Sequence, residues 1–128
     1  MAVEKNIPIL IVDDYKTMLR IIRNLLRQLE FQNVEEAADG ASTLQLLENQ
    51  EFALIISDWN MEPMTGLQLL REVRKSPRLR HIPFIMITAE SKTENVIAAK
   101  EAGVSNYIVK PFNAETLKAK LSSVLGPI

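Results

Sequence analysis

Residues 9–14 read ILIVDD, four consecutive isoleucine, leucine or valine residues followed by two aspartates. The run is too short for a helix, and apolar residues at every position indicate a strand that is buried on both faces. Similar runs occur at residues 54–56, 84–87 and 107–109, and residues 34–38 form a more polar candidate that suits the edge of a sheet. Runs of this kind are typical of a parallel sheet that helices cover on both sides.

Segments of helical period lie between these strands. The first has its apolar residues at the spacing of one helix face: Met18, Ile22, Leu25 and Leu29. Leucine and valine repeat in a similar way within residues 67–73 and 117–125. Capping residues mark predicted helix starts at two capping-box pairs, Thr65/Gln68 and Ser91/Glu94, and at the N-cap candidates Asp39 and Asn113. The repeated alternation of strand and helix predicts a doubly wound α/β domain with a five-stranded parallel sheet.

Length and composition agree with a single domain over residues 1–128. Hydrophobic residues make up 47% of the chain and charged residues 24%, as in ordinary globular proteins. A formal net charge of −1 argues against a nucleic acid or a membrane surface as a partner. The absence of cysteine excludes disulfide scaffolds and thiolate metal sites, and a single histidine, His81, argues against a histidine-based triad. No apolar run approaches the roughly 18–20 residues of a membrane span, so we expect a cytoplasmic protein.

Polar residues gather at the points where the predicted strands end. Asp13 and Asp14 follow the first strand, Asp58 follows the third, Thr88 the fourth and Lys110 the fifth. In an open α/β sheet, ligands bind outside the carboxyl ends of the strands, so we expect these side chains at one edge. The chain has twelve glutamates but only four aspartates, and three of the four belong to this set.

The charges of this set predict a divalent cation. Three carboxylates and one ammonium leave a formal charge of −2, which one divalent cation would neutralise. Oxygen ligands in a shallow, hydrated site favour Mg²⁺ over softer metals. A carboxylate beside such a cation, with lysine and threonine donors facing it, is arranged to receive a phosphoryl group as an acyl phosphate. Each residue taken singly is an ordinary helix cap or turn residue, and their joint placement carries the prediction.

The stretches IVDD, ISDWNM and YIVKPF, together with Thr88-Ala89, resemble response-regulator receiver domains, and in particular the CheY-like chemotaxis family. The resemblance covers essentially the whole chain and implies a flavodoxin-like sheet in the order 2-1-3-4-5. It implies that Asp58 is the phosphoacceptor, that Thr88 and Lys110 contact the phosphoryl oxygens, and that the Lys110–Pro111 bond is cis. It also implies a set of residues for Mg²⁺: Asp13, Asp14, Asp58 and the backbone carbonyl of Asn60.

The same resemblance implies a switch, partners and an output. Thr88 and Tyr107 are expected to change together on phosphorylation, and Asn60 and Glu90 to influence the lifetime of the phosphate. The implied partner face comprises Thr93, Val96, Lys100, Tyr107, Val109, Asn113 and Lys120. The implied partners are a sensor histidine kinase, the flagellar motor switch and a phosphatase. We therefore expect a monomeric signalling protein that has no effector domain and is not an enzyme.

Three alternatives remain to be distinguished from a motor regulator. A receiver acting as a phosphate sink or phosphorelay carrier would share all the residues above. A Mg²⁺-dependent aspartyl-phosphate phosphatase would carry Asp-x-Asp after the first strand, where this chain has Asp13-Asp14-Tyr15. A flavin-binding module would need a loop rich in serine, threonine and glycine at the same place, and two aspartates would repel its phosphate.

Two positions depart from the usual receiver pattern. Residues 61–66 read MEPMTG, with the proline one place later than usual and an acid, Glu62, near the predicted phosphoacceptor. Because proline restricts its own backbone and that of the preceding residue, this loop is expected to differ in shape. Glu62 either adds a carboxylate to the outer shell of the metal or is a solvated loop acid. Glu30 replaces the glycine that normally ends the first helix, at an expected cost of about 1 kcal/mol if its backbone is left-handed.

Overall fold

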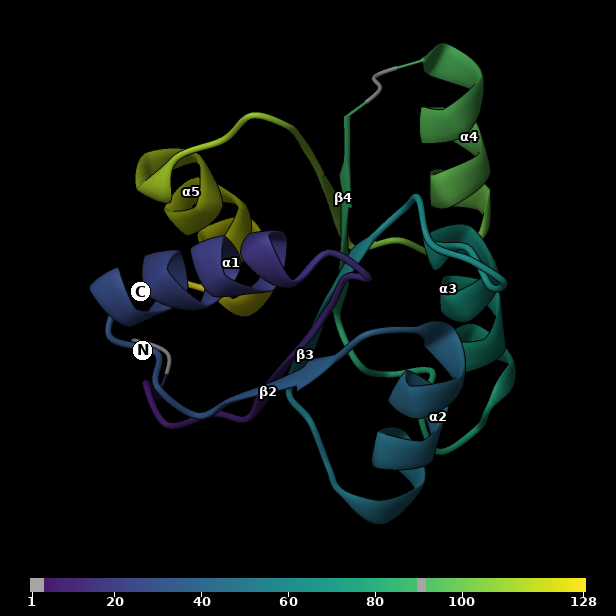
Figure 1. Ribbon diagram of the computed structural model, residues 1–128, viewed down its shortest axis with the longest axis horizontal. Coiled ribbons are helices and arrows are strands. Elements are labelled where there is room, and N and C mark those ends of the chain that lie inside the picture. Colours follow the sequence, from purple (N-terminus) through teal and green to yellow (C-terminus); the bar gives the residue numbers. More distant parts are fainter. Residues whose placement is uncertain (1–3, 90–91) are drawn as a thin grey trace.

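The computed structural model describes residues 4–89 and 92–128, which form a parallel sheet with helices on both faces (Figure 1). The strands are β1 (Ile9–Val12), β2 (Val34–Ala37), β3 (Leu54–Asp58), β4 (Phe84–Thr88) and β5 (Asn106–Val109). The helices are α1 (Lys16–Gln28), α2 (Gly40–Asn49), α3 (Gly66–Lys75), α4 (Thr93–Glu101) and α5 (Ala114–Leu125). All neighbouring strands are parallel and follow the order β2-β1-β3-β4-β5, which confirms the predicted fold class and strand order.

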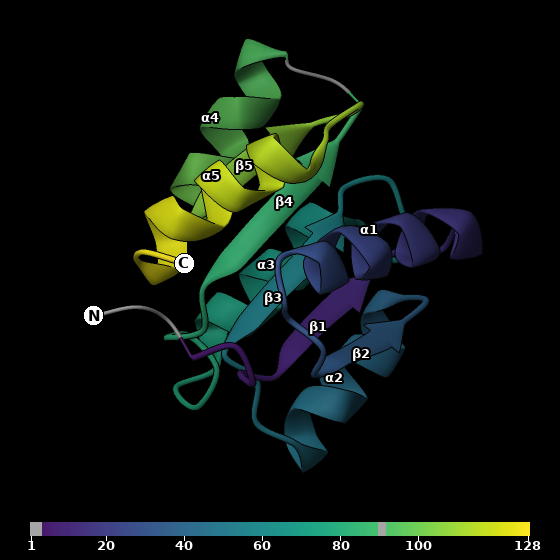
Figure 2. The same cartoon turned by 90° about the vertical axis from the view of Figure 1, so that its left-hand side faces the viewer.

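The sheet separates two hydrophobic cores. Helices α1 and α5 cover one face, and α2, α3 and α4 cover the other (Figures 1 and 2). Successive residues of β1 alternate between the cores: Ile9 and Ile11 pack under α1 and α5, and Leu10 and Val12 pack on the side of α2 and α3. Burial on both faces is the reason that every position of this strand is apolar.

The prediction that residues 107–109 are buried on both faces of the sheet is wrong for β5. Within β5 only Ile108 is buried, while Tyr107 is half-buried and Val109 is 40% exposed. The physical reason is that β5 is an edge strand, paired only with β4 among the described strands. At the opposite edge, β2 has buried ends and two exposed glutamates between them, as predicted for an edge strand.

The buried face of α1 is displaced from the predicted one. Ile22 is buried as expected, but the other buried residues of the helix are Leu19 and Leu26. These three positions follow the i, i+3, i+7 spacing of one helix face. The remaining predicted residues are only partly buried and pack against the margin of the same core: Met18, Leu25 and Leu29.

Capping side chains define several of the helix starts. Thr65 and Gln68 form the predicted capping box at α3, in which Gln68 Oε1 accepts the Thr65 N–H at 2.8 Å and Thr65 Oγ1 accepts the Gln68 N–H at 3.2 Å. Asp39 at α2 and Asn113 at α5 each accept the backbone N–H three residues later, at 2.7 and 2.9 Å. These four cap residues confirm the sequence-based starts.

The start of α4 differs from the prediction. Its N-cap is Lys92, one residue after the predicted cap, and Lys92 makes no side-chain capping hydrogen bond. Ser91, the predicted cap, lies outside the described residues. At the end of α1, Glu30 has φ of 75°, so its backbone is left-handed, the condition under which the sequence analysis expected a cost in stability.

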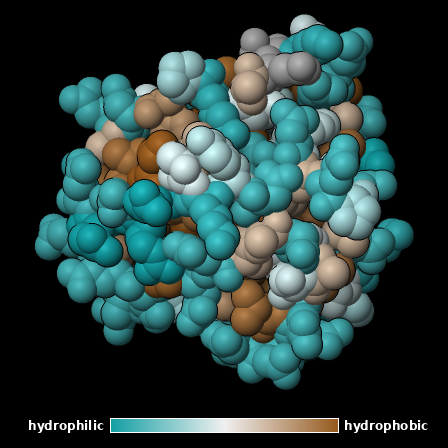
Figure 3. Space-filling model, in the orientation of Figure 1, coloured by the Kyte–Doolittle hydropathy of each residue, from teal (hydrophilic) through white to brown (hydrophobic). Residues whose placement is uncertain are grey.

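The described surface is largely polar. None of the helices in residues 4–89 and 92–128 is both long and apolar enough to span a membrane. The space-filling view shows a mainly hydrophilic face with separate apolar patches (Figure 3). Large apolar side chains that are exposed include Ile97 of α4 and Val109 of β5. Both elements belong to the partner face expected from the sequence.

Candidate functional site

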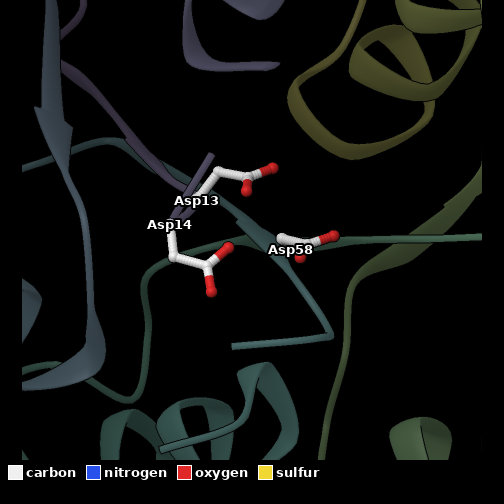
Figure 4. A group of neighbouring side chains, drawn as sticks. All are labelled: Asp13, Asp14 and Asp58. Atoms are coloured by element: carbon white, nitrogen blue, oxygen red, sulfur yellow. The ribbon is translucent and has the colours of Figure 1, made fainter. Parts of the chain in front are cut away.

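Three aspartates meet at the carboxyl end of the sheet. Asp13 and Asp14 directly follow β1, and Asp58 is the last residue of β3. Because β1 and β3 are neighbouring parallel strands, residues far apart in the sequence converge at one edge. One carboxylate oxygen from each aspartate lies within 4.8 Å of the other two, and Figure 4 shows the three side chains close together.

The environments of the three carboxylates differ. Asp13 and Asp58 are 2% and 4% exposed, whereas Asp14 is open to solvent. Asp13 Oδ1 accepts the Tyr15 N–H at 3.0 Å, but no donor of the described residues forms a hydrogen bond to its buried Oδ2. Burial, together with the nearby Asp58 and Asp14 charges, raises the pKa of Asp13 to about 6 against the opposing effects of the Tyr15 N–H and Lys110. A buried carboxylate oxygen left without a donor beside two further carboxylates fits a divalent cation.

Lys110 supplies positive charge to the same place. Its Nζ donates a hydrogen bond to Asp58 Oδ1 at 2.9 Å and lies 4.0 Å from Asp13 Oδ2. Its backbone N–H donates to the Thr88 carbonyl at 2.7 Å, which joins the ends of β4 and β5. The Lys110–Pro111 bond is cis, as expected. Three carboxylates and one ammonium therefore share one edge of the sheet, with a formal charge of −2 between them.

Thr88 completes the row of strand ends. It is the last residue of β4 and is 2% exposed. The strand β4 runs between β3 and β5, so Thr88 lies between the strands that lead to Asp58 and Lys110. The structure thus brings all five residues predicted from strand ends to the same edge.

Comparison with known proteins agrees with this geometry. Residues 9–122 match the family described as the response regulator receiver domain. The chemotaxis protein CheY-3 of Vibrio cholerae is 52% identical over 120 residues, which are 94% of this chain and 92% of that protein. The chain belongs to the response regulator receiver family. It is a CheY-like receiver domain of two-component signal transduction.

Solved receiver domains have the same fold. The structure of CheY4 from Vibrio cholerae aligns with a TM-score of 0.87 at 35% identity, covering 94% of this chain and 99% of that one. The receiver domain of the sensor histidine kinase PA1611 from Pseudomonas aeruginosa aligns with a TM-score of 0.85 at 28% identity, covering 94% and 98%. That structure is described as having a magnesium ion coordinated in its active-site cleft.

The loop after the receiver's third strand turns sharply at Trp59. The Trp59 carbonyl accepts the N–H groups of Met61 and Gly66, at 3.2 and 2.9 Å. Met61 is 2% exposed, so its side chain fixes the middle of the loop to the core. The Glu62–Pro63 bond is cis. Sequence reasoning expected an altered loop here but did not anticipate this bond.

A surface cavity of about 320 Å³ adjoins the acidic cluster. The predicted metal residues Asp14 and Asn60 line it, and both are exposed. The complete set of lining residues is Asp14, Asn60, Met61, Glu62 and Thr65. The structure therefore places Glu62 beside the predicted metal site, where the sequence left two interpretations open. Glu90, the second residue expected to affect phosphate lifetime, lies outside the described residues.

An aromatic pair connects the site with the predicted switch residue. The rings of Trp59 and Tyr107 have centroids 6.4 Å apart at an interplanar angle of 72°, an edge-to-face arrangement. Trp59 directly follows Asp58, and Tyr107 lies on β5. Nothing in the spacing of Trp59 and Tyr107 along the sequence indicates that their rings meet.

The predicted partner residues lie on α4, β5 and α5 or, in the case of Asn113, directly before α5, and the two helices flank the edge strand (Figure 2). The exposed members are Thr93, Lys100, Val109 and Asn113, and the half-buried members are Val96, Tyr107 and Lys120. Asn113 also caps α5, so it has a structural role as well. The sequence analysis did not select Ile97, which is 49% exposed on α4.

Proposed function

We propose that this receiver domain accepts a phosphoryl group from a sensor histidine kinase on Asp58. The observation that carries the proposal is the position of Asp58: it is buried, in contact with the Lys110 ammonium at 2.9 Å, and beside the Asp13 carboxylate. A carboxylate oxygen of Asp58 attacks the phosphorus of phosphohistidine, an acyl P–O bond forms, and the P–N bond breaks with imidazole as the leaving group.

Mg²⁺ is the cation that we propose for this reaction. The residues that would hold it are Asp13, Asp14, Asp58 and the backbone carbonyl of Asn60. When bound, Mg²⁺ offsets the charge that develops on the phosphoryl oxygens. Lys110 and Thr88 would donate hydrogen bonds to the same oxygens. The domain modifies its own carboxylate, and we propose that it is not an enzyme acting on a separate substrate.

We propose that phosphorylation changes the partner face through Thr88 and Tyr107. The phosphoryl group brings roughly one further negative charge to Asp58. A hydrogen bond from Thr88 to that group would draw the end of β4 toward Asp58, and Tyr107 on the neighbouring strand would change its side-chain position. Because the Trp59 ring contacts Tyr107, the same change reaches the residue next to Asp58. Asn60 and Glu90 would influence how long the acyl phosphate persists.

The output that we propose is binding of the α4–β5–α5 face to the flagellar motor switch in chemotaxis. Its support is the similarity to a chemotaxis protein and the apolar exposure of Ile97 and Val109 on this face. Lys100 and Lys120 would suit acidic segments of a partner. We propose a cytoplasmic monomer whose signal a phosphatase can end. The alternative role is a phosphate sink or phosphorelay carrier.

Fluorescence of Trp59, the only tryptophan in the chain, tests the phosphorylation site. We expect a change on addition of Mg²⁺ and a second change with acetyl phosphate or beryllofluoride. In Asp58→Asn the second change should be absent, because no carboxylate remains to accept the group. A wild-type protein that gives no response, or an Asp58→Asn variant that responds like the wild type, would rule out the assignment.

A binding experiment separates the two possible outputs. The beryllofluoride-treated protein is compared with untreated protein for binding to a motor-switch peptide and to the domain of a sensor kinase. A motor regulator should bind the peptide more tightly after treatment. A sink or carrier should show no gain for the peptide while still exchanging phosphoryl groups with the kinase.

A further inference from the structure

We propose that Glu62 is an outer-sphere residue of the cation site. Its carboxylate would accept hydrogen bonds from water molecules on a divalent cation held by the three aspartates, and so raise the affinity for that cation. The proposal rests on the proposed function, because it assumes that the aspartates bind a cation. It adds a positioning residue from the loop that departs from the usual receiver sequence.

The first observation is the place of Glu62 in the fold. It lines the cavity of about 320 Å³ that Asp14 and Asn60 also line. Both Asp14 and Glu62 are exposed, so the cavity that they line is open to water. The neighbouring Met61 is buried, and the Trp59 carbonyl accepts the N–H groups on both sides of the turn. These contacts fix the loop that carries Glu62 beside this cavity.

The second observation is independent of Glu62 and concerns Asp13. Its Oδ2 is buried and has no hydrogen-bond donor within residues 4–89 and 92–128. Oxygen atoms of Asp14 and Asp58 lie within 4.8 Å of the ligand atom of Asp13. A buried acceptor that has no hydrogen-bond donor, lies beside two further carboxylates and is 4.0 Å from the Lys110 ammonium is best satisfied by an additional cation. The acidic cluster therefore indicates a ligand before Glu62 is considered.

Charge and hydration connect the two observations. Within the described chain, no ion pair neutralises Glu62, so with Glu62 the formal charge of this edge becomes −3. Mg²⁺ gives up its water reluctantly and usually retains several water molecules in protein sites. Carboxylates that accept hydrogen bonds from such water act as outer-shell partners, and their removal weakens metal binding. Glu62 is exposed and lines the cavity that Asp14 also lines, where the retained water molecules would be.

The affinity for Mg²⁺, measured by Trp59 fluorescence, tests the proposal without any phosphoryl transfer. Titrations at an ionic strength of about 0.15 M limit the reach of surface charges to roughly 8 Å. Glu62→Gln should bind Mg²⁺ ~3- to 10-fold more weakly than the wild type. Glu62→Lys should bind more weakly still, whereas Glu62→Asp should stay within about 2-fold because it keeps the charge. If the loop had a purely structural role, the Mg²⁺ affinities of these variants would not follow the charge at position 62.

Two variants serve as controls. Glu72→Gln makes the same charge change at an exposed position of α3, where Glu72 pairs with Lys75 at 3.6 Å. It should leave the affinity within about 2-fold of the wild type. Asp14→Asn should weaken Mg²⁺ binding more than any Glu62 variant. The inference is overturned if Glu62→Gln binds like the wild type, or if Glu62→Asp binds as weakly as Glu62→Gln. A wild-type protein that does not bind Mg²⁺ would overturn the proposed function as well.

Discussion

Lys110 forms a hydrogen bond with Asp58 but only a long ion pair with Asp13: its Nζ is 2.9 Å from Asp58 Oδ1 and 4.0 Å from Asp13 Oδ2. Both carboxylates are buried at the ends of adjacent strands, yet only one has the ammonium within hydrogen-bond distance. Asp13 is left with the Tyr15 N–H on its other oxygen. The metal-free domain therefore contains one paired and one poorly compensated carboxylate. Removing the lysine that pairs with Asp58 and removing the charge of Asp13 should have opposite effects on stability.

Lys110→Met should destabilise the metal-free domain. The variant keeps a long side chain but leaves the buried Asp58 carboxylate without its donor, so the free energy of unfolding should fall by about 1–3 kcal/mol. Saturating Mg²⁺ supplies positive charge at the same site and should reduce this loss. Urea denaturation with and without Mg²⁺ measures both effects.

The surface pair Lys75–Glu72, with its atoms 3.6 Å apart, provides the control for this substitution. Lys75→Met should change stability by less than about 0.5 kcal/mol, because exposed pairs contribute little. Equal losses in the two lysine variants would show that the contact of Lys110 with Asp58 has no special energetic role.

Asp13→Asn should stabilise the metal-free domain at neutral pH. The pKa of Asp13 is raised from 3.8 to about 6 in the folded state, so its ionisation opposes folding at pH 7. Its favourable contribution is present below pH 4 and is lost as the pH rises through 6. Asparagine keeps an oxygen for the Tyr15 N–H, and the variant should gain on the order of 1–2 kcal/mol at pH 7. This gain should shrink as the pH falls from 7 to 4.

Urea denaturation at several pH values without divalent cations checks that trend. Asp14→Asn is the matched control, since it removes the same charge at an exposed position next in the sequence. A gain for Asp13→Asn that stays constant between pH 7 and 4 would contradict the assigned pKa shift.

The positions of the strand ends could be predicted from the sequence because topology alone brings them together. Short apolar runs identify the strands, and parallel neighbours place Asp13, Asp58 and Lys110 at one edge whatever the details of packing. The unequal distances from Lys110 could not be predicted in this way. They depend on the side-chain conformations of these three residues, which the order of the strands does not set.

The buried face of a helix is harder to predict than the position of a strand end where apolar residues are abundant. In α1 the apolar residues form a band wider than one stripe, and Met18 and Leu19 are both apolar. Packing against the sheet and α5 selects Leu19 for full burial and leaves Met18 at the margin. The Trp59–Tyr107 contact is equally hard to predict from the sequence, because it joins a loop to an edge strand through tertiary packing alone.

The end of α1 offers a stabilising substitution. The Glu30 N–H donates to the Arg27 carbonyl and the Phe31 N–H to the Leu26 carbonyl, both at 2.9 Å, which is the Schellman pattern. Glu30 adopts φ of 75°, a conformation that glycine tolerates better than other residues. Glu30→Gly should therefore raise the free energy of unfolding by about 0.5–1 kcal/mol. Thermal denaturation measures this gain.

The end of α4 allows the opposite substitution, in which a left-handed glycine is replaced by alanine. Gly103 makes the same two-bond pattern with φ of 93°, and an added Cβ would lie 3.2 Å from Arg74 Nε. Gly103→Ala should lower the free energy of unfolding by about 1–2 kcal/mol. If Glu30→Gly brought no gain while Gly103→Ala was destabilising, strain at Glu30 would have to be relieved by contacts of its side chain.

Substitution of Gly66, at the start of α3, should lower both the stability of the domain and its affinity for Mg²⁺. A Cβ at this position would collide with the backbone oxygen of Asp58 and would lie 2.8 Å from Met86 Sδ. A backbone oxygen cannot rotate away, so Gly66→Ala must displace α3 from the strand that carries Asp58. We expect a loss of about 1–3 kcal/mol in the free energy of unfolding. Mg²⁺ binding, followed by Trp59 fluorescence, should weaken at the same time because Asp58 is displaced.

Gly40→Ala provides the comparison for this last prediction. A Cβ at Gly40 would meet the side chain of Met64, most closely at its flexible Sδ end, so the loss of stability should be smaller and Mg²⁺ binding should weaken less than in Gly66→Ala. The two glycines both begin helices, but only Gly66 packs against the backbone of the Asp58 strand. Equal effects of the two substitutions on Mg²⁺ binding would mean that the position of Asp58 does not depend on the close approach of α3.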